Sequence, residues 1–313
     1  MEEEKPIFSI FLLCDKIRKS HEGGGLMKLS DINIRDPFVL VYDGAYYLYG
    51  TRGATCWGEA DGFDVYMSRD LETWSDAAEC FHSDGSFFAT KNYWAPEVYF
   101  VKDAFYMFAS FKGENMCRGT AVLKAESPLG PFRLHSDKTV TPREWDCLDG
   151  TLYQDRHGDF YMIFCHEWVQ AGDGEICCIK LKDDLSAADG EAKVLFRASE
   201  AKWAKTVRHS SGITGYVTDG PFMWRTADGT LLMLWASFSE GGYTQGVAVS
   251  DNGEITGHFT QTEPLFAKDG GHGMVFCDLQ GNMRLALHSP NDHLKERPVF
   301  FPLREEKGRL CRM

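Results

Sequence analysis

The sequence predicts an all-β fold, and more specifically a five-bladed β-propeller. From residue 31 onward, segments typical of β-strands recur, whereas patterns typical of helices are scarce. One unit also appears five times: a small or acidic residue, an apolar strand, a turn, and a second strand rich in aromatic residues. The units begin about fifty to seventy residues apart, which is enough for a four-stranded antiparallel blade with its loops. A two-sheet sandwich, the alternative architecture, would not need five similar strand pairs.

The five strand pairs are each joined by a short turn. The first pair turns at Asp43-Gly44 and the second at Lys102-Asp103, and the later turns are expected near residues 156–158, 228–229 and 280–281. The pairs themselves are predicted at residues 36–51, 95–110, 148–164, 218–235 and 271–288. Third strands are expected at 63–68, 119–125, 176–181 and 246–250, and Glu72-Thr73-Trp74, Pro131-Phe132 and His258-Phe259 are expected to lead into fourth strands.

Composition restricts the class of partner. Of the 313 residues, 43% are hydrophobic and 25% are charged, which is ordinary for a globular domain. The net charge of −13 repels phosphate backbones, so we expect no nucleic-acid partner. No apolar run approaches the ~18 residues of a membrane span, so no membrane partner is expected either. No feature of the sequence predicts an oligomeric state.

Residues 1–28 share no pattern with the rest of the chain, and we expect an N-terminal extension followed by one propeller domain at 29–313. The run Gly23-Gly24-Gly25 stands just before Met27, and glycine codons are rich in purines. One hypothesis is therefore a ribosome-binding site read as protein, with Met27 as the natural start and residues 1–26 not native. The alternative is a genuine but poorly packed tail.

The cellular location is predicted to be cytoplasmic. The chain begins with acidic residues, which is unlike a secretory signal. Its ten cysteines include no CxxC pair, so we expect free thiols in a reducing compartment rather than disulfides or a zinc site.

Acidic residues recur at the start of the repeats. The first strand of each propeller blade lines the central channel, so residues at the same end of these strands share one mouth. Asp36, Glu97, Asp149, Asp219 and His272 hold roughly equivalent positions. Like charges at close range raise at least one pKa, which suits a reaction in which one carboxyl donates a proton and another accepts one. Inverting glycoside hydrolysis needs such a pair, roughly 6.5–9.5 Å apart. Alternatively, these acids cap strand ends or turns.

In their order and spacing, the motifs around these residues resemble glycoside hydrolase family 43. The resemblance covers about residues 32–291 and implies a five-bladed propeller and an inverting hydrolase of α-L-arabinofuranosides or β-D-xylosides. The matching motifs are Arg35-Asp36-Pro37, Tyr93-Trp94-Ala95-Pro96-Glu97, Leu148-Asp149-Gly150, Thr218-Asp219-Gly220-Pro221-Phe222, Gly271-His272-Gly273 and Leu287-His288-Ser289-Pro290-Asn291.

The resemblance also implies roles for the three aspartates. Asp36 corresponds to the general base, and Asp149 to the carboxylate that orients the acid and tunes its pKa. Asp219 stands where the family places its general acid, which is normally Glu. The shorter side chain leaves three outcomes open: Asp219 acts as the acid, Glu97 or Glu167 takes that role, or the protein is feeble or inactive.

Substrate contacts are expected near the carboxylates. Trp94 and Trp168 are candidates for stacking against sugars, as is Trp57, and Arg35, Glu97 and His272 are the polar candidates. The alternative is that the aromatic residues pack within the fold. The shape of the site is expected to depend on the loops at 80–93 and 200–216.

No cofactor is expected to be required, but some family members hold calcium or water in the channel near a histidine. His288 is the predicted ligand of a structural Ca²⁺ held through waters, with His272 as a second candidate. A hydrogen-bonded channel histidine without metal is the alternative, because hard cations prefer oxygen ligands.

The observations favour an intracellular inverting glycosidase, and the resemblance implies that it releases arabinofuranosyl or xylosyl units from short plant-derived oligosaccharides. One alternative is a propeller glycosidase for another sugar, such as a fructoside or galactoside. A second is a catalytically silent carbohydrate-binding propeller. A serine hydrolase is disfavoured, because no G-x-S-x-G motif is present.

Overall fold

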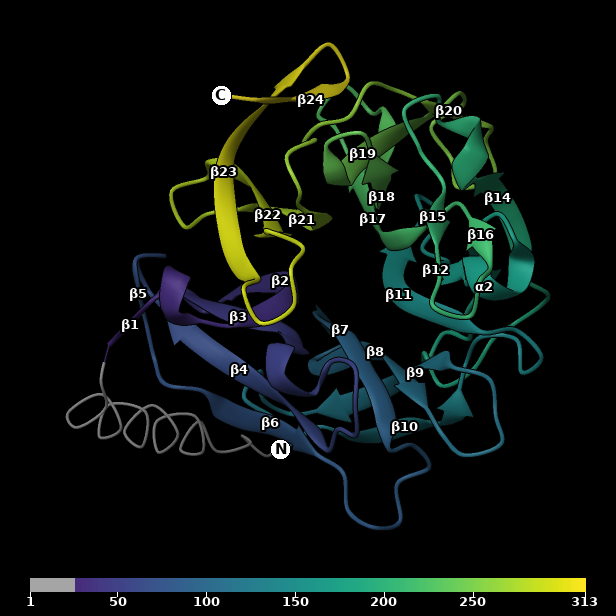
Figure 1. Ribbon diagram of the computed structural model, residues 1–313. Coiled ribbons are helices and arrows are strands. Elements are labelled where there is room, and N and C mark those ends of the chain that lie inside the picture. The colour runs from purple at the N-terminus through teal and green to yellow at the C-terminus, as the bar shows by residue number, and fades with distance from the viewer. Residues whose placement is uncertain (1–25) are drawn as a thin grey trace, which may run out of the picture.

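Five antiparallel sheets surround a central channel, which confirms the predicted propeller (Figure 1). The computed structural model describes residues 26–313. In each blade the first strand lies next to the channel and the following strands step outward. The innermost strands are β2 (Ile34–Tyr42), β7 (Lys91–Val101), β11 (Cys147–Gln154), β17 (Asp219–Arg225) and β21 (Gly271–Cys277).

The other strands complete the blades in chain order. The second strands are β3 (Ala45–Arg52), β8 (Ala104–Lys112), β12 (Phe160–His166), β18 (Leu231–Ser239) and β22 (Met283–Ser289). The third are β4 (Gly62–Ser68), β9 (Gly119–Ala125), β13 (Glu175–Lys180), β19 (Gly242–Ser250) and β23 (Arg297–Glu306). The outer strands are β6 (Ala78–His82), β10 (Arg133–Thr139), β14 (Lys193–Arg197), β20 (Phe259–Gln261) and β24 (Arg309–Arg312).

A few short elements lie outside this plan. Strand β1 (Met27–Lys28) pairs with β5 (Thr73–Trp74) at the edge of the first blade, and β15 (Val207–Arg208) pairs with β16 (Thr214–Gly215) in a small hairpin. The helical turns are η1 (Leu29–Asp31), η2 (Gly53–Thr55), α2 (Trp168–Ala171) and η3 (Ala198–Glu200). Between residues 26 and 313, no helix has the length and apolar character needed to cross a membrane.

The predicted turns form as expected. Asp43 and Gly44 both have positive φ, at 47° and 68°, as a two-residue hairpin turn of type I′ requires. Lys102 and Asp103 repeat this conformation in the second blade. The turn chemistry therefore sets the register of the first hairpins.

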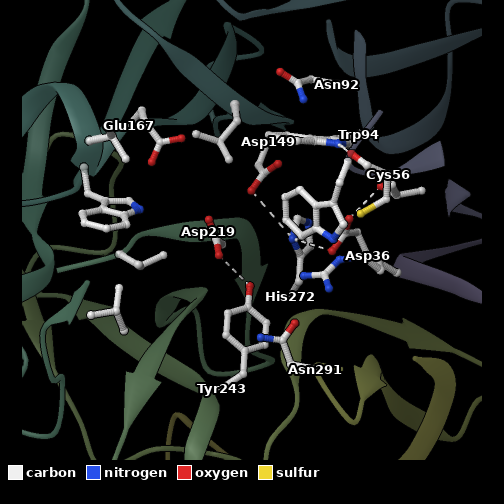
Figure 2. A pocket seen from close by; sticks show the side chains of 18 of the residues that line it. Asp36, Cys56, Asn92, Trp94, Asp149, Glu167, Asp219, Tyr243, His272 and Asn291 are labelled. Carbon is white, nitrogen blue, oxygen red and sulfur yellow. Dashed lines mark hydrogen bonds and ion pairs between the residues drawn. The ribbon is translucent and has the colours of Figure 1, made fainter. Parts of the chain in front are cut away.

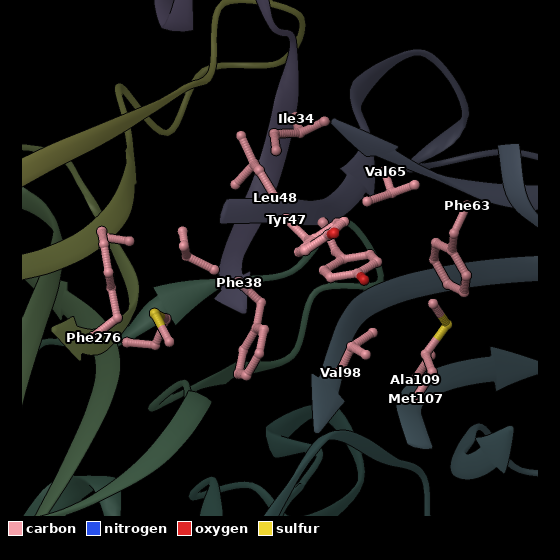
Figure 3. Packing of buried hydrophobic residues seen from close by; sticks show 14 of the residues in the cluster. Ile34, Phe38, Tyr47, Leu48, Phe63, Val65, Val98, Met107, Ala109 and Phe276 are labelled. Carbon is pink, nitrogen blue, oxygen red and sulfur yellow. The ribbon is translucent and has the colours of Figure 1, made fainter. Parts of the chain in front are cut away.

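The core lies between neighbouring blades. Because each blade is covered on both faces, the second strands are buried almost throughout rather than alternating, as in β8 and β18. Figure 3 shows this packing: Tyr47 and Val65 of the first blade lie toward Val98 and Met107 of the second. Apolar burial of this kind holds the blades around the channel and fixes the strand ends that form its mouth.

The last blade closes onto the first through side chains at the mouth. Arg35 Nη1 forms an ion pair of 2.8 Å with Glu296 Oε1, and Asn33 Nδ2 donates to the Glu296 carbonyl. Arg297 Nε donates to the carbonyl of Ser30. Residues 1–25 of the predicted N-terminal extension lie outside the described residues, and a domain boundary after residue 28 stays a prediction.

Every innermost strand carries the same β-bulge close to its start. In the first blade Arg35 pairs with Thr51 and Phe38 pairs with Tyr49, so β2 holds one more residue than β3 between these pairs. The same extra residue lies between Trp94 and Glu97, Leu148 and Thr151, Asp219 and Phe222, and Gly271 and Met274.

The first residue of each bulge has a left-handed backbone conformation. These residues are Asp36 (φ 54°), Ala95 (φ 45°), Asp149 (φ 58°), Gly220 (φ 49°) and His272 (φ 53°). Apart from glycine, Asp, Asn and His are the residues that tolerate this region best. The register therefore corrects the predicted equivalence of the blades: Asp219 lies one residue before the bulge position, and Glu97 lies two residues after it.

Candidate active site

A cavity of about 710 Å³ opens at the mouth of the channel, where the bulges gather (Figure 2). All three predicted catalytic aspartates line it. Of the predicted substrate-binding residues, Arg35, Trp94, Trp168 and His272 line it as well. The predicted loops also contribute, through Asn92 from the first and residues 207–210 from the second.

Asp36 is held as an ionised carboxylate. Its Oδ2 accepts a hydrogen bond of 2.6 Å from the Thr51 hydroxyl, and its Oδ1 lies 3.2 Å from Nδ1 of His272. Burial would raise the pKa of Asp36, but His272, the neighbouring Arg35 and the Thr51 hydrogen bond outweigh burial and lower the pKa below its usual value. An ionised carboxylate at this position is able to accept a proton.

Asp149 approaches the same ring nitrogen of His272 as Asp36 does. Its Oδ2 accepts a hydrogen bond of 3.0 Å from the backbone N–H of Gly220 and lies 3.7 Å from His272 Nδ1. Burial and the nearby charge of Asp36 raise the pKa of Asp149. The pKa of Asp36 is therefore lowered and that of Asp149 is raised, although both side chains contact the same histidine.

Asp219 occupies the opposite side of the cavity from Asp36 (Figure 2). Its Oδ2 accepts a hydrogen bond of 2.9 Å from the Tyr243 hydroxyl. Burial and the charge of Asp149 raise the pKa of Asp219, while His272 and the Tyr243 hydrogen bond oppose that rise. A carboxyl with a raised pKa keeps its proton near neutral pH and is able to donate it.

Small residues in two blades leave room for this cluster. The bulge positions of the second and fourth blades hold Ala95 and Gly220, so only three of the five blades project a long polar side chain. A Cβ atom added to Gly220 would lie 2.6 Å from the imidazole ring of His272, which therefore packs directly against the glycine backbone.

Glu97 is not brought to the cavity. Because it lies two residues after the first residue of the bulge, it sits deeper in the channel, where its Oε2 accepts a hydrogen bond from the Tyr99 hydroxyl. Tyr99 in turn contacts Thr151 Oγ1 at 2.8 Å. Burial raises the pKa of Glu97 to about 8, so this carboxyl is protonated at neutral pH. This geometry does not fit the predicted role of Glu97 in substrate binding, nor the role of an alternative acid.

His288, the predicted calcium ligand, has protein partners at both ring nitrogens. It is fully buried; Nδ1 accepts a hydrogen bond of 3.1 Å from the Asp36 backbone N–H, and Nε2 lies 3.3 Å from Asn291 Oδ1. Burial lowers the pKa of His288 to about 3, so the ring is neutral. These contacts fit a hydrogen-bonded channel histidine better than a metal ligand, and the calcium site stays a prediction.

A single group with the spacing of a metal site is found within residues 26–313, and it does not include His288. Asp61, Glu79 and His82 lie close together on the exposed surface of the first blade. Arg52 forms ion pairs with both acids, at 3.0 Å and 2.9 Å. The guanidinium therefore already neutralises much of the charge that would attract a cation.

Aromatic and basic side chains line the wall formed by the first two blades. The Trp57 and Trp94 rings meet edge to face, with centroids 5.6 Å apart. The guanidinium of Arg35 lies 5.3 Å from the Trp57 centroid, and that of Arg118 lies 4.7 Å from the Trp94 centroid. Arg118 also forms an ion pair with Glu167. We call Arg35, Trp57, Trp94 and Arg118 the aromatic wall.

Several lining residues were not predicted from the sequence. Thr51 pairs with the residue before the first bulge, whereas Tyr243 and Arg118 lie at or before the starts of third strands. Thr51 could have been found from the strand register, because it pairs with Arg35, the residue directly before Asp36. Tyr243 and Arg118 have no signal in the repeat, since the other blades hold different residues there.

Comparison with known proteins matches this geometry to one family. The sequence model named "Glycosyl hydrolases family 43" matches residues 30–301. The chain is 24% identical over 273 residues to the extracellular exo-alpha-(1->5)-L-arabinofuranosidase ArbA of Cellvibrio japonicus, covering 81% of this chain and 73% of the relative.

Solved structures have the same fold. The crystal structure of an endo-arabinase from Bacteroides thetaiotaomicron matches with a TM-score of 0.85 and 40% identity, covering 90% of this chain and 98% of that one. An endo-1,4-beta-xylanase from the same organism matches with a TM-score of 0.74 over 92% and 97% of the two chains. At 23% identity, the second likeness concerns the fold alone.

The predicted cytoplasmic location was wrong. The curated relative is an extracellular enzyme, which points away from the cytoplasm. The prediction rested partly on free cysteines, and the nine cysteines among residues 26–313 are indeed unpaired. Free thiols are therefore a poor indicator of compartment.

Proposed function

The chain belongs to family 43 of the glycosyl hydrolases, and we propose that it cleaves α-1,5-linked L-arabinofuranosyl chains with inversion at the anomeric carbon. The observation that carries the proposal is that two carboxyl groups line one cavity in surroundings that shift their pKa values in opposite directions. The pKa of Asp36 is lowered and that of Asp219 is raised. Inverting hydrolysis requires one carboxylate and one carboxylic acid on opposite sides of the bond.

In this mechanism Asp36 is the general base. Its carboxylate accepts a proton from a water molecule as the water oxygen attacks the anomeric carbon. The hydrogen bond from Thr51 and the contact with His272 keep Asp36 ionised and fix its orientation. Transfer of a proton to a positioned base typically contributes 10²–10⁴-fold to the rate.

Asp219 is the general acid. It donates its proton to the glycosidic oxygen as the bond to the anomeric carbon breaks, and the leaving sugar departs as a neutral alcohol. The Tyr243 hydroxyl then stabilises the Asp219 carboxylate that is left. One proton is taken up at Asp36 and one is given up at Asp219, so exchange with solvent restores both groups.

Asp149 tunes and orients the acid. Its charge contributes to the raised pKa of Asp219, and its hydrogen bond from Gly220 ties it to the residue that follows the acid. This arrangement supports Asp219 as the acid over Glu167, because Glu167 is paired with Arg118.

The arabinan specificity rests on the two arabinose-specific relatives, of which one is described as exo-acting and the other as endo-acting. To test the proposal, we would supply linear α-1,5-arabino-oligosaccharides and aryl arabinofuranoside, xyloside, galactoside and fructoside to the wild type and to Asp36→Asn. The prediction is hydrolysis of the arabinosides, lost by about 10³-fold in the variant.

A matched control is Asp43→Asn, because Asp43 also has positive φ but lies in a turn between β2 and β3. Full activity is expected for this variant. Hydrolysis of another glycoside alone would reject the arabinan specificity. Sugar binding without turnover in the wild type would instead favour a carbohydrate-binding propeller.

A further inference from the structure

Trp57 exposes a large apolar ring at the edge of the catalytic cavity. Its side chain is 61% exposed, whereas the other seven tryptophans of the chain are buried or partly buried. Burial of an aromatic ring is one of the larger favourable contributions to folding, so an exposed indole beside a cavity forgoes stability that packing would provide. Exposed apolar surface of this kind often marks a binding site.

The loop that carries Trp57 is anchored on both sides. Trp94 Nε1 donates a hydrogen bond of 2.6 Å to the Cys56 carbonyl, and the Gly58 N–H donates to the Thr55 carbonyl at 3.2 Å. The Ala60 N–H donates to the Thr90 carbonyl at 3.0 Å. The indole is therefore presented in a defined position before any ligand arrives, which lowers the entropy cost of binding.

The surroundings of Trp57 leave it available to a ligand. Arg35 covers part of the ring, and the ion pair between Arg35 and Glu296 holds that guanidinium in place. Trp94 contacts Trp57 edge to face at an interplanar angle of 74°, so it does not stack over the ring. The high exposure of Trp57 shows that these contacts leave much of the indole open.

The aromatic wall also offers hydrogen-bond donors. Arg118 is 9% exposed, and its guanidinium lies 4.7 Å from the centroid of the Trp94 ring. Arg35 and Arg118 line the same cavity as Trp57. Sugars combine an apolar C–H face with hydroxyl edges, which is the complement of a ring flanked by guanidinium groups.

We infer that Trp57 forms an outer sugar-binding subsite, so that the protein binds longer pentose oligosaccharides more tightly than a disaccharide. The inference rests on the proposed function for the identity of the sugar, but it concerns binding rather than cleavage. A disaccharide occupies the positions on either side of the reacting bond, and a longer chain extends along the aromatic wall to the exposed indole.

The test measures binding in the absence of turnover. Linear α-1,5-arabino-oligosaccharides of increasing length would be titrated by calorimetry into Asp36→Asn, and into the same variant carrying Trp57→Ala or Trp57→Phe. The affinity of Asp36→Asn is expected to rise about tenfold from the disaccharide to longer chains. Trp57→Ala should remove most of that gain, and Trp57→Phe should keep part of it.

Phe100→Ala is the matched control, because Phe100 is also an exposed aromatic residue (41%) but lies on β7 away from the cavity. This variant should keep the full dependence on chain length. Equal affinity at all lengths, an unchanged profile in Trp57→Ala, or no binding at all would overturn the subsite. Length-dependent binding through Trp57 without turnover in the wild type would reject the proposed hydrolysis but leave the subsite standing.

Discussion

His272 Nδ1 lies 3.2 Å from Oδ1 of Asp36, and the two residues occupy the same bulge position in the last and first blades. A bulge redirects the side chain of its strand, and here five bulges face one channel. The cluster of Asp36, Asp149 and His272 is therefore built by repetition of one backbone feature. Its charge pattern depends on which residue each blade places there.

Replacing Gly220 by Ala should disturb this cluster. The added Cβ would lie 2.6 Å from the His272 ring, at a residue with positive φ. We expect a loss of roughly 1–3 kcal/mol in the free energy of unfolding, together with reduced activity, because His272 must move. Denaturant unfolding and kcat/KM would measure both effects.

Gly44→Ala tests the effect of backbone strain in the absence of a steric clash with His272. Gly44 also has positive φ, but a Cβ there would meet no atom within 4 Å. This variant should lose stability without a change in kcat/KM. Equal effects of the two substitutions on activity would show that contact with His272 is unimportant.

Replacing Thr51 by Val should shift the pH profile. The Thr51 hydroxyl donates to the ionised form of Asp36, so its removal raises the pKa of that carboxylate. A base with a higher pKa becomes protonated at higher pH, so the acidic limb of kcat/KM should move to higher pH. At acidic pH, kcat/KM of Thr51→Val should be about tenfold lower than that of the wild type, since a hydrogen bond to a charged group contributes ~1.5 kcal/mol.

Thr51→Ser retains the hydroxyl and should restore the wild-type limb. Thr51 Oγ1 also accepts a hydrogen bond from the Ala95 N–H, so Val leaves that donor without a partner. An acidic limb that does not move in Thr51→Val would argue against Asp36 as the group that titrates there.

Replacing Glu97 by Gln should stabilise the protein at high pH. Burial raises the pKa of Glu97 from 4.5 to about 8, so between these values the folded chain keeps a proton that the unfolded chain loses. The free energy of unfolding of the wild type therefore falls as pH rises through this window, by up to ~1.4 kcal/mol per pH unit. Gln does not titrate, so this fall in the free energy of unfolding should be missing from Glu97→Gln.

The measurement is denaturant unfolding at pH 5 and pH 8. Relative to the wild type, Glu97→Gln should gain stability between the two pH values, whereas Glu126→Gln, at an exposed glutamate, should not. A constant difference between Glu97→Gln and wild type across the range would contradict a protonated Glu97.

Most of the fold was predictable because it repeats. The five strand pairs and their turns follow from local chemistry, and the apolar runs fit blades that are covered on both faces. Asp36, Asp149 and His272 were identified by position alone. The outer strand β14 and the strands β23 and β24 were not singled out, since they lie outside the repeated pair.

Two parts of the site could not be predicted for physical reasons. The bulge adds one residue that the sequence pattern does not reveal, so Glu97 was aligned with Asp36 although it lies deeper in the channel. Tyr243 and Arg118 reach the cavity from third strands or the loops before them, and only the assembled ring brings them beside Asp219 and Asp149.

The assignment of Asp219 as the acid is tested most directly by the dependence of Asp219→Asn on the leaving group. Asparagine has the same size but cannot donate a proton to the glycosidic oxygen. Turnover of an arabino-oligosaccharide, whose leaving group needs that proton, should fall by about 10³-fold. An aryl arabinofuranoside with an acidic phenol should lose much less, and Glu167→Gln should show no such difference. An equal loss on both substrates, or unchanged turnover of the oligosaccharide, would contradict the account.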